Sequence, residues 1–286
     1  MSIRIITDSA SDSAELRQQN VTVLPLSITF GTQTYQDGVD LSHAQFYEKL
    51  ASCKELPTTS QVSPHAFQKA FQDTVSAGDI GICITISSKL SGTYQSAVLA
   101  AQDFPGRIWV IDSLSVSLGE RILVELALRL RDQSLDAEAI VNQLEDQKKQ
   151  IRVIALMHTL EYLKRGGRIS RTAAFAGGIL SIKPVIAIQD GEISVLGKAR
   201  GSKQGNNLLV QQIRKNGGVD FSQPHILGYT GTDDSLIQTY IQDCAALWQP
   251  YVSTLTVSTI GGTIGTHAGP GAIGVAFFAK TPDSVS

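Results

Sequence analysis

Hydroxyl-bearing residues crowd the segment SSKLSGTYQSA, residues 87–97, which follows the apolar run DIGICITI, residues 79–86. This pattern predicts a strand that ends where a helix begins, with Ser91 as N-cap, Gly92 as a point of close backbone approach and Thr93 as a further hydroxyl. In a parallel α/β sheet such a junction lies where ligands bind, and helix N-termini there offer unpaired N–H groups to an anion. A serine that only caps its helix explains Ser91 equally well.

Two other polar segments could meet the first one. PTTSQVSP, residues 57–64, presents the hydroxyls of Thr59 and Ser60 between a helix end and a helix start, where such residues often serve only in turns. His267 is the single histidine among the small residues of GGTIGTHAGPGAIGV, residues 261–275, and its imidazole could donate to an anion. The chain has no GxxxxGK[ST] motif, which excludes a Walker A phosphate loop.

A serine hydrolase is the enzyme that these residue types suggest. Ser91 and His267 could act as nucleophile and base, with Asp8 or Asp112 as the orienting acid. However, the local sequence KLSGT lacks the GxSxG elbow that exposes such a serine on a strand-to-helix turn. No set of His, Asp or Glu residues shows convincing metal-ligand spacing around these segments, so we expect no metal site.

Composition limits the partners of the chain. Its 286 residues are 42% hydrophobic, and a formal net charge of −2 indicates no general attraction for nucleic acid or an anionic membrane. No uncharged apolar stretch reaches the ~18 residues of a membrane span, and the apolar run near the N-terminus is too short for a signal peptide. Three scattered cysteines without CxxC spacing fit a reducing compartment. We therefore expect a cytoplasmic protein without stable membrane insertion.

The elements that must position these residues follow an alternating pattern. Aliphatic runs at 3–7, 21–30, 79–86 and 107–112 alternate with helical patterns, which predicts a mainly parallel sheet. The predicted N-caps of three of these helices are Ser42, Ser63 and Asp136.

The sequence pattern changes near residue 155, after which the apolar runs are shorter and glycine is more frequent. Asp190-Gly191 is a strong hairpin signal within 183–199, and helices are predicted near 204–215 and 233–248. Strands are predicted at 225–230 and 251–258, followed by a glycine-punctuated strand pair that ends in AIGVAFFA. The fold class is thus α/β, with two α/β domains: 1–154, which carries the hydroxyl-rich loops, and 155–286, which carries His267.

Basic residues gather in two short segments of the second half. They are LKRGGRISR, residues 163–171, and GKARGSK, residues 197–203. A run of charge is often only a solvated surface, but two arginine-bearing loops in a slightly acidic protein could dock an acidic partner.

Several segments together resemble the DegV family, the fatty-acid-binding subunits of bacterial fatty acid kinase. The resemblance runs through nearly the whole chain, in order and at family-like spacing. It rests on TDSASD (7–12), LPLSITFG (24–31), TSQ (59–61), ISSKLSGTYQSA (86–97), LKRGGRIS (163–170) and THAGPGAIGVAF (266–277).

The resemblance implies a long-chain fatty acid buried between the two domains, with no other cofactor. Its carboxylate would be held by Thr59, Ser91 and His267, and the supporting loop residues would be Ser60, Gly92 and Thr93. The protein would not be an enzyme itself. An ATP-dependent fatty acid kinase would phosphorylate the bound carboxylate to an acyl-phosphate for phospholipid synthesis, and Arg168 and Arg200 match the positions at which the family docks that kinase.

Overall fold

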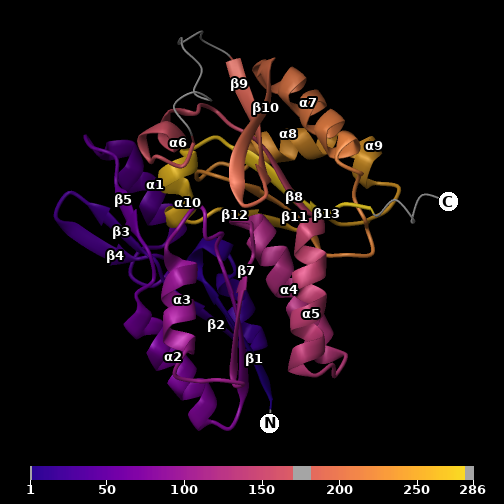
Figure 1. Cartoon of the computed structure of the whole chain (residues 1–286). Helices are drawn as coiled ribbons and strands as arrows, with labels where there is room; N and C mark the ends of the chain where they lie inside the picture. Colours follow the sequence, from indigo (N-terminus) through magenta and orange to yellow (C-terminus); the bar gives the residue numbers. More distant parts are fainter. Residues whose placement is uncertain (1, 170–181, 281–286) are drawn as a thin grey trace.

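Four parallel strands form the first sheet, as the alternating pattern predicts. The computed structural model describes residues 2–169 and 182–280, and its first half is the lower part of Figure 1. The strand order is β2-β1-β6-β7, and every neighbouring pair is parallel. The strands are β1 (Ile3–Asp8), β2 (Val21–Leu24), β6 (Ile80–Thr85) and β7 (Ile108–Asp112).

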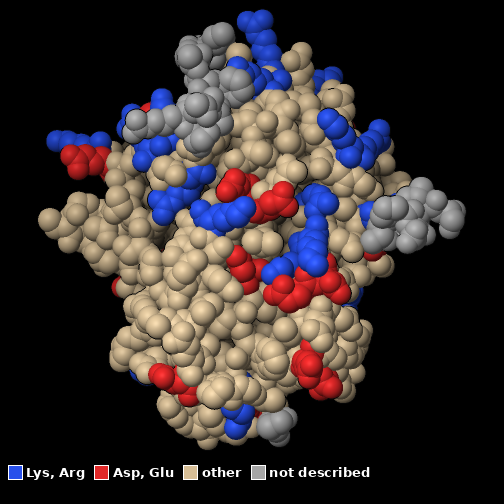
Figure 2. Space-filling model, viewed as in Figure 1, with Lys and Arg blue, Asp and Glu red and all other residues tan. Residues whose placement is uncertain are grey.

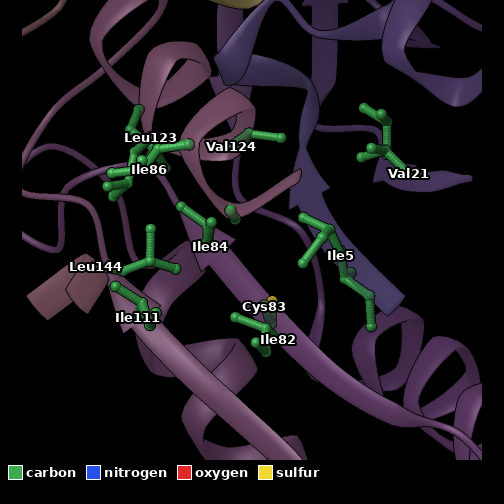
Figure 3. Packing of buried hydrophobic residues seen from close by; sticks show 14 of the residues in the cluster. Ile5, Val21, Ile82, Cys83, Ile84, Ile86, Ile111, Leu123, Val124 and Leu144 are labelled. Atoms are coloured by element: carbon green, nitrogen blue, oxygen red, sulfur yellow. The ribbon is translucent and has the colours of Figure 1, made fainter. Parts of the chain in front are cut away.

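Helices cover both faces of this sheet. Those on one face are α2 (Pro64–Ser76) and α3 (Thr93–Ala101), and those on the other are α4 (Leu118–Asp132) and α5 (Ala137–Gln147). Figure 3 shows the packing, with Leu144 of α5 next to Ile111 of β7 and Val124 of α4 above Ile84 of β6.

The three helix starts that the sequence predicts are confirmed. Ser63 accepts a hydrogen bond from the Ala66 backbone ahead of Pro64, and Asp136 accepts one from the Ala139 backbone. Ser42 forms a capping box with Gln45 at the start of α1 (His43–Ser52).

A second sheet, with mixed strand directions, occupies the upper part of Figure 1. Its order is β10-β9-β8-β13-β11-β12, in which only the β11–β12 pair is parallel. The strands are β8 (Ile151–Leu156), β9 (Ile182–Gln189), β10 (Glu192–Arg200), β11 (His225–Tyr229), β12 (Val257–Thr259) and β13 (Ile273–Phe278). The predicted turn at Asp190-Gly191 joins β9 to β10.

The second sheet is also covered on both faces. Its outer face carries α7 (Gly201–Lys215) and α8 (Ser235–Asp243), and α9 (Ala245–Trp248) follows α8. Its inner face packs against α4, which also contacts β1 and β6 of the first sheet. One largely buried helix is therefore shared by the two sheets.

The chain enters the second sheet with β8 at Ile151, so the predicted division after residue 154 falls inside this strand. The division into domains 1–154 and 155–286 stays a prediction.

A small third sheet projects from the first half, and it corrects two expectations. The run 21–30 is not one strand but β2 and β3 (Ser27–Phe30), and part of the expected turn 57–64 is the strand β5 (Thr58–Ser60). The antiparallel order is β4-β3-β5, with β4 at Gln33–Gln36.

Two further expectations, near the C-terminal end, were wrong. The glycine-punctuated segment that ends in AIGVAFFA is not a strand pair, because Gly262–Ala268 form the helix α10 before β13 begins. The predicted strand 251–258 is reduced to β12. In Figure 1 the gold helix α10 lies between α1 and α6 (Glu161–Arg165), which places it against both halves of the chain.

Short 3-10 helices complete the fold at Ser9–Ser11, Ala14–Gln19 and Lys148–Gln150. In the described part of the chain we find no helix with the length and apolar character that crossing a bilayer requires.

Candidate functional site

A cavity of about 420 Å³ lies where α4, α10 and the inner face of the second sheet meet. This volume is within the range of small-molecule sites. Its walls are mostly aliphatic, and they come from both halves of the chain. They include Leu26, Ile86, Leu90, Val116, Leu118, Val153, Ala155, Met157, Leu163, Ile186, Ile188, Ile193, Ile260, Ile264, Ala272 and Ile273.

Polar groups converge on part of the cavity wall. Thr59, Ser91 and His267 all line it, and so do Ser60 and Gly92. The Thr59 hydroxyl is 2.9 Å from His267 Nε2, although the two residues are 208 positions apart in the chain. The fold therefore places the three residues that the resemblance implied on the wall of one cavity, with Thr59 and His267 in direct contact.

Strand pairing fixes the direction of the Thr59 side chain. Thr59 lies opposite Ile28 in the β3–β5 ladder, and Ile28 is fully buried. Because side chains alternate along a strand, the partly buried Thr59 points inward while its neighbours Thr58 and Ser60 are exposed.

The loop before α3 differs from the expectation in one detail. Gly92, not Ser91, occupies the N-cap position, and the Ser91 hydroxyl accepts a hydrogen bond from the Thr93 backbone at 3.3 Å. The hydroxyls of Ser91 and Thr93 lie 2.9 Å apart. Thr93 is buried and contacts the Val62 backbone N–H, so it supports the loop instead of lining the cavity.

Gln61 is a cavity residue to which the sequence analysis assigned no role. Its amide nitrogen donates to the Ser96 hydroxyl at 2.7 Å, and its carboxamide covers Gly92 so closely that a Cβ there would lie 2.0 Å from Gln61 Oε1. A side chain at position 92 would thus displace the Gln61 carboxamide, while the backbone dihedral angles of Gly92 are open to other residues. Gln61 is the last residue of the TSQ motif, so the sequence marked this position, but its contacts with Ser96 and Gly92 are visible only in the fold.

His267 lies in an environment that favours its neutral form. Burial, with the positive charge of Arg168 as a second cause, lowers the pKa of His267 to about 4. Its Nδ1 is buried without a hydrogen-bond partner among the described residues, and it lies against Gly166, where a Cβ would be 2.1 Å from that nitrogen. The imidazole that the sequence offers as a donor to an anion is therefore neutral near pH 7.

The two arginines expected at a docking surface lie in different environments. Arg168 is partly buried and lines the cavity, where its guanidinium donates to the carbonyls of Leu90 and Gly166. Arg200 is exposed, immediately before α7, and is not part of the cavity wall. In Figure 2, Lys and Arg side chains gather over the region where Figure 1 places α6, next to several Asp and Glu side chains.

The described contacts do not assemble a hydrolase triad. Asp8 accepts hydrogen bonds from the backbone of Ala10 and Ile86, and Asp112 accepts them from the backbone of Ser88 and Leu114. His267 Nε2 contacts Thr59, and the Ser91 hydroxyl contacts Thr93. Asp8 and Asp112 thus accept hydrogen bonds from backbone N–H groups, and Ser91 and His267 are bonded to other residues and not to each other.

Four acidic residues are buried in the described first half of the chain but do not line the cavity. Burial raises the pKa of Asp8 to about 7 and that of Asp12 to about 6, and it raises the pKa of Glu120 well above its usual value. Asp37, also buried, contacts the start of α10. Asp12, Asp37 and Glu120 received no role from the sequence, although Asp8 and Asp12 belong to the TDSASD motif.

The fold and this cavity define an α/β protein with a largely apolar cavity between two sheets and with hydroxyl and imidazole groups on the cavity wall. A family model described as "Uncharacterised protein, DegV family" matches residues 2–280. A DegV domain-containing protein of Caldanaerobacter subterraneus is 40% identical over 282 residues, covering 97% of this chain and 99% of the relative. The chain belongs to the DegV family, as the resemblance indicated.

Solved structures of similar proteins have the same fold. A fatty-acid-binding DegV family protein from Thermus thermophilus superimposes with a TM-score of 0.87 at 32% identity, covering 98% of this chain and 100% of that one. A stearic acid-binding protein from Eubacterium ventriosum superimposes with a TM-score of 0.85 at 30% identity, covering 96% and 97%.

Proposed function

We propose that this protein encloses a long-chain fatty acid, with the tail in the apolar cavity and the carboxylate at Thr59, Ser91 and His267. The observation that carries this proposal is one aliphatic cavity with these three donors on its wall. The Thermus and Eubacterium structures, which are described as fatty-acid-binding and stearic acid-binding proteins, support it.

The two parts of the ligand would contribute differently to binding. A tail of about fourteen buried methylenes contributes on the order of 11 kcal/mol before ordering costs. A hydrogen bond to a charged group contributes about 1.5–3 kcal/mol. The tail would thus dominate the affinity, and the head-group residues would orient the carboxylate and select an acid over an alcohol.

Arg168 would supply the positive charge near the carboxylate. Because His267 is neutral near pH 7, it would act as a hydrogen-bond partner and not as a counter-charge. The Arg168 guanidinium lies close enough to His267 to lower its pKa, and it lines the same cavity.

The protein would then present the carboxylate to an ATP-dependent kinase, which forms an acyl-phosphate for phospholipid synthesis. Ser60 and Gln61 are exposed and also line the cavity, which places its polar part next to the surface. The exposed Arg200 would contact the kinase. In this proposal the protein is a cytoplasmic, non-catalytic subunit.

Lipid extraction tests the binding proposal directly. Mass spectrometry of an organic extract should detect an acyl ligand of the purified protein, and the delipidated protein should bind palmitate or oleate saturably. A protein with neither an acyl ligand nor affinity for these acids would refute the proposal.

The kinase part has its own test. Arg200→Gln should reduce acyl-phosphate formation by a DegV-dependent kinase, with palmitate affinity unchanged. Arg214→Gln, at an exposed position on helix α7, which begins directly after Arg200, is the matched control. Equal rates for both variants and the parent protein would argue against docking at Arg200.

The alternative of a hydrolase remains testable with a fluorophosphonate probe. Labelling that is lost in Ser91→Ala would favour an enzyme. We expect no labelling, because His267 contacts Thr59 and the Ser91 hydroxyl contacts Thr93.

A further inference from the structure

The helix that carries His267 is short and receives its N-terminal caps from another part of the chain. Helix α10 has seven residues, and its N-cap is Gly261, which has no side chain to bond the first turn. Helices of this length are unstable alone, and their first N–H groups need acceptors. The position of His267 must therefore be set by contacts outside the helix.

Two buried carboxylates supply these acceptors. Asp12 accepts a hydrogen bond from the Gly261 N–H at 2.7 Å. Asp37 accepts from the N–H groups of Gly262 at 3.2 Å and Thr263 at 3.0 Å, and from the Thr263 hydroxyl at 2.6 Å. Both acids are at most 4% exposed. Asp37 alone thus makes three of the four hydrogen bonds that fix the first turn.

The segment just before α10 is held by the same part of the chain. The Tyr47 hydroxyl donates to the Ile260 carbonyl at 2.9 Å, and the His43 ring lies 3.0 Å from the Thr259 hydroxyl. Gly262 and Gly265 pack so closely against Phe46 that a Cβ at either position would lie within 3.0 Å of its ring. The backbone of α10 therefore packs directly against the Phe46 ring of α1. This close packing leaves little space for the start of α10 to move.

Thr263 and His267 lie on the same face of α10. They are four residues apart, which is about one turn and 6 Å along the axis, and both line the cavity. A displacement of Thr263 would consequently move His267 relative to Thr59, which lies on a different element.

We propose that Asp37 is a positioning residue, which fixes Thr263 so that His267, one turn further on, meets Thr59 and the head group of the ligand. The expected effect on ligand binding rests on the proposed function, whereas the expected effect on the position of His267 does not. Asp37 itself is absent from the cavity wall. It acts on the ligand only through α10.

The binding experiment compares Asp37→Asn with the parent protein for palmitate and for hexadecanol. Loss of a bond to a charged head group should lower palmitate affinity about tenfold, with hexadecanol affinity changed less than about twofold. In a His267→Ala background, Asp37→Asn should have no further effect on palmitate. Parallel losses for acid and alcohol, or an undiminished effect without His267, would overturn the proposal.

The matched control is Asp40→Asn, an exposed acid in the same loop that accepts a bond from the Gln36 backbone instead of α10. Thr263→Val removes only the hydroxyl bond to Asp37 and provides a second variant if Asp37→Asn unfolds. Both variants are compared with the parent protein by thermal unfolding, so that lost stability is separated from lost positioning.

A ligand-free measurement separates this inference from the proposed function. In ¹⁵N-histidine NMR spectra, Asp37→Asn and Thr263→Val should shift the His267 Nε2 signal, and Asp40→Asn should leave it unchanged. An unchanged His267 signal in both variants would overturn the inference even if the protein binds palmitate. A parent protein that binds no fatty acid would refute the proposed function, while the NMR result would still decide the role of Asp37.

Discussion

Thr59 and His267, from strand β5 and helix α10, lie 2.9 Å apart on the wall of an apolar cavity. Their contact joins the small third sheet to the C-terminal part of the chain. A carboxylate at this point would meet a hydroxyl and a neutral imidazole, with the Arg168 guanidinium nearby.

The first prediction concerns the head-group hydroxyls. Thr59→Val keeps the shape of the side chain but removes its hydroxyl, so palmitate affinity should fall about tenfold, and hexadecanol affinity less, because bonds to charged groups are stronger. Ser91→Ala should act in the same direction. Thr58→Val, on the exposed face of the same strand, should leave both affinities unchanged. Isothermal titration calorimetry of the delipidated protein measures both affinities. Equal losses of affinity for the acid and the alcohol would contradict a carboxylate site.

The second prediction concerns the ionisation of His267. In ligand-free protein its imidazole should stay neutral from pH 8 down to about pH 5, since its pKa is lowered from 6.5 to about 4. The unfolded chain takes up this proton near pH 6.5, so the stability that His267 contributes is present above that pH and is lost as pH falls toward 4. NMR titration of the labelled histidine checks the pKa.

Arg168→Gln tests the causes of this shift. It should raise the pKa of His267 but leave it below 6.5, because burial is the larger cause. Arg165→Gln, at an exposed arginine paired with Glu161, is the control and should not move it. A pKa that stays at about 4 in Arg168→Gln would show that the guanidinium does not act on His267.

The third prediction concerns Glu120, whose pKa burial and the neighbouring Asp8 raise well above its usual value. The folded protein keeps this proton to a higher pH than the unfolded chain, which releases it above about 4.5. Stability is therefore lost as pH rises above this value, by up to about 1.4 kcal/mol per pH unit, until the carboxyl ionises in the folded protein as well. Glu120→Gln should therefore change stability little near pH 4.5 and increase it at pH 8. Urea unfolding at both values measures the difference.

Glu138→Gln, at an exposed position in the first turn of α5, is the control for this pH dependence. The amide at position 120 can still accept from the Thr7 hydroxyl, as Glu120 Oε1 does at 3.0 Å. A Glu120→Gln variant that is less stable than the parent protein at pH 8 would show that the carboxyl is ionised in the fold.

The fourth prediction concerns the tail. A Cβ at Gly274 would meet Leu118 at 3.5 Å and Ala155 at 3.7 Å, which are ordinary contacts, and Gly274 lines the cavity. Gly274→Ala should thus fold but shift the preference toward shorter acids, by roughly fourfold per excluded methylene for the longest chain that fits.

Gly228 lies opposite Gly274 in the β11–β13 ladder and provides the contrast. A Cβ there would lie 2.9 Å from both methyl groups of Leu118 and 3.2 Å from the Ser258 carbonyl. Gly228→Ala should therefore lower the melting temperature. An unchanged chain-length profile in Gly274→Ala would indicate that the tail lies elsewhere in the cavity.

Local sequence signals determined much of the framework. Aliphatic runs such as 79–86 predict buried strands because parallel strands covered on both faces need apolar side chains throughout, and Ser42, Ser63 and Asp136 predict helix starts because their side chains accept N–H bonds. The hydroxyls of Thr59 and Ser91 and the isolated His267 were also visible as candidate donors.

Only the tertiary structure decided how these donors meet. A three-residue strand such as β5 is too short for a periodic signal, and the glycine-rich segment 261–268 has little intrinsic preference for a helix. Helix α10 forms there because Asp12 and Asp37 cap it and Phe46 packs against its glycines. Contacts between residues more than 200 positions apart depend on packing and not on local pattern, and for that reason the arrangement of the site could not be derived from the sequence alone.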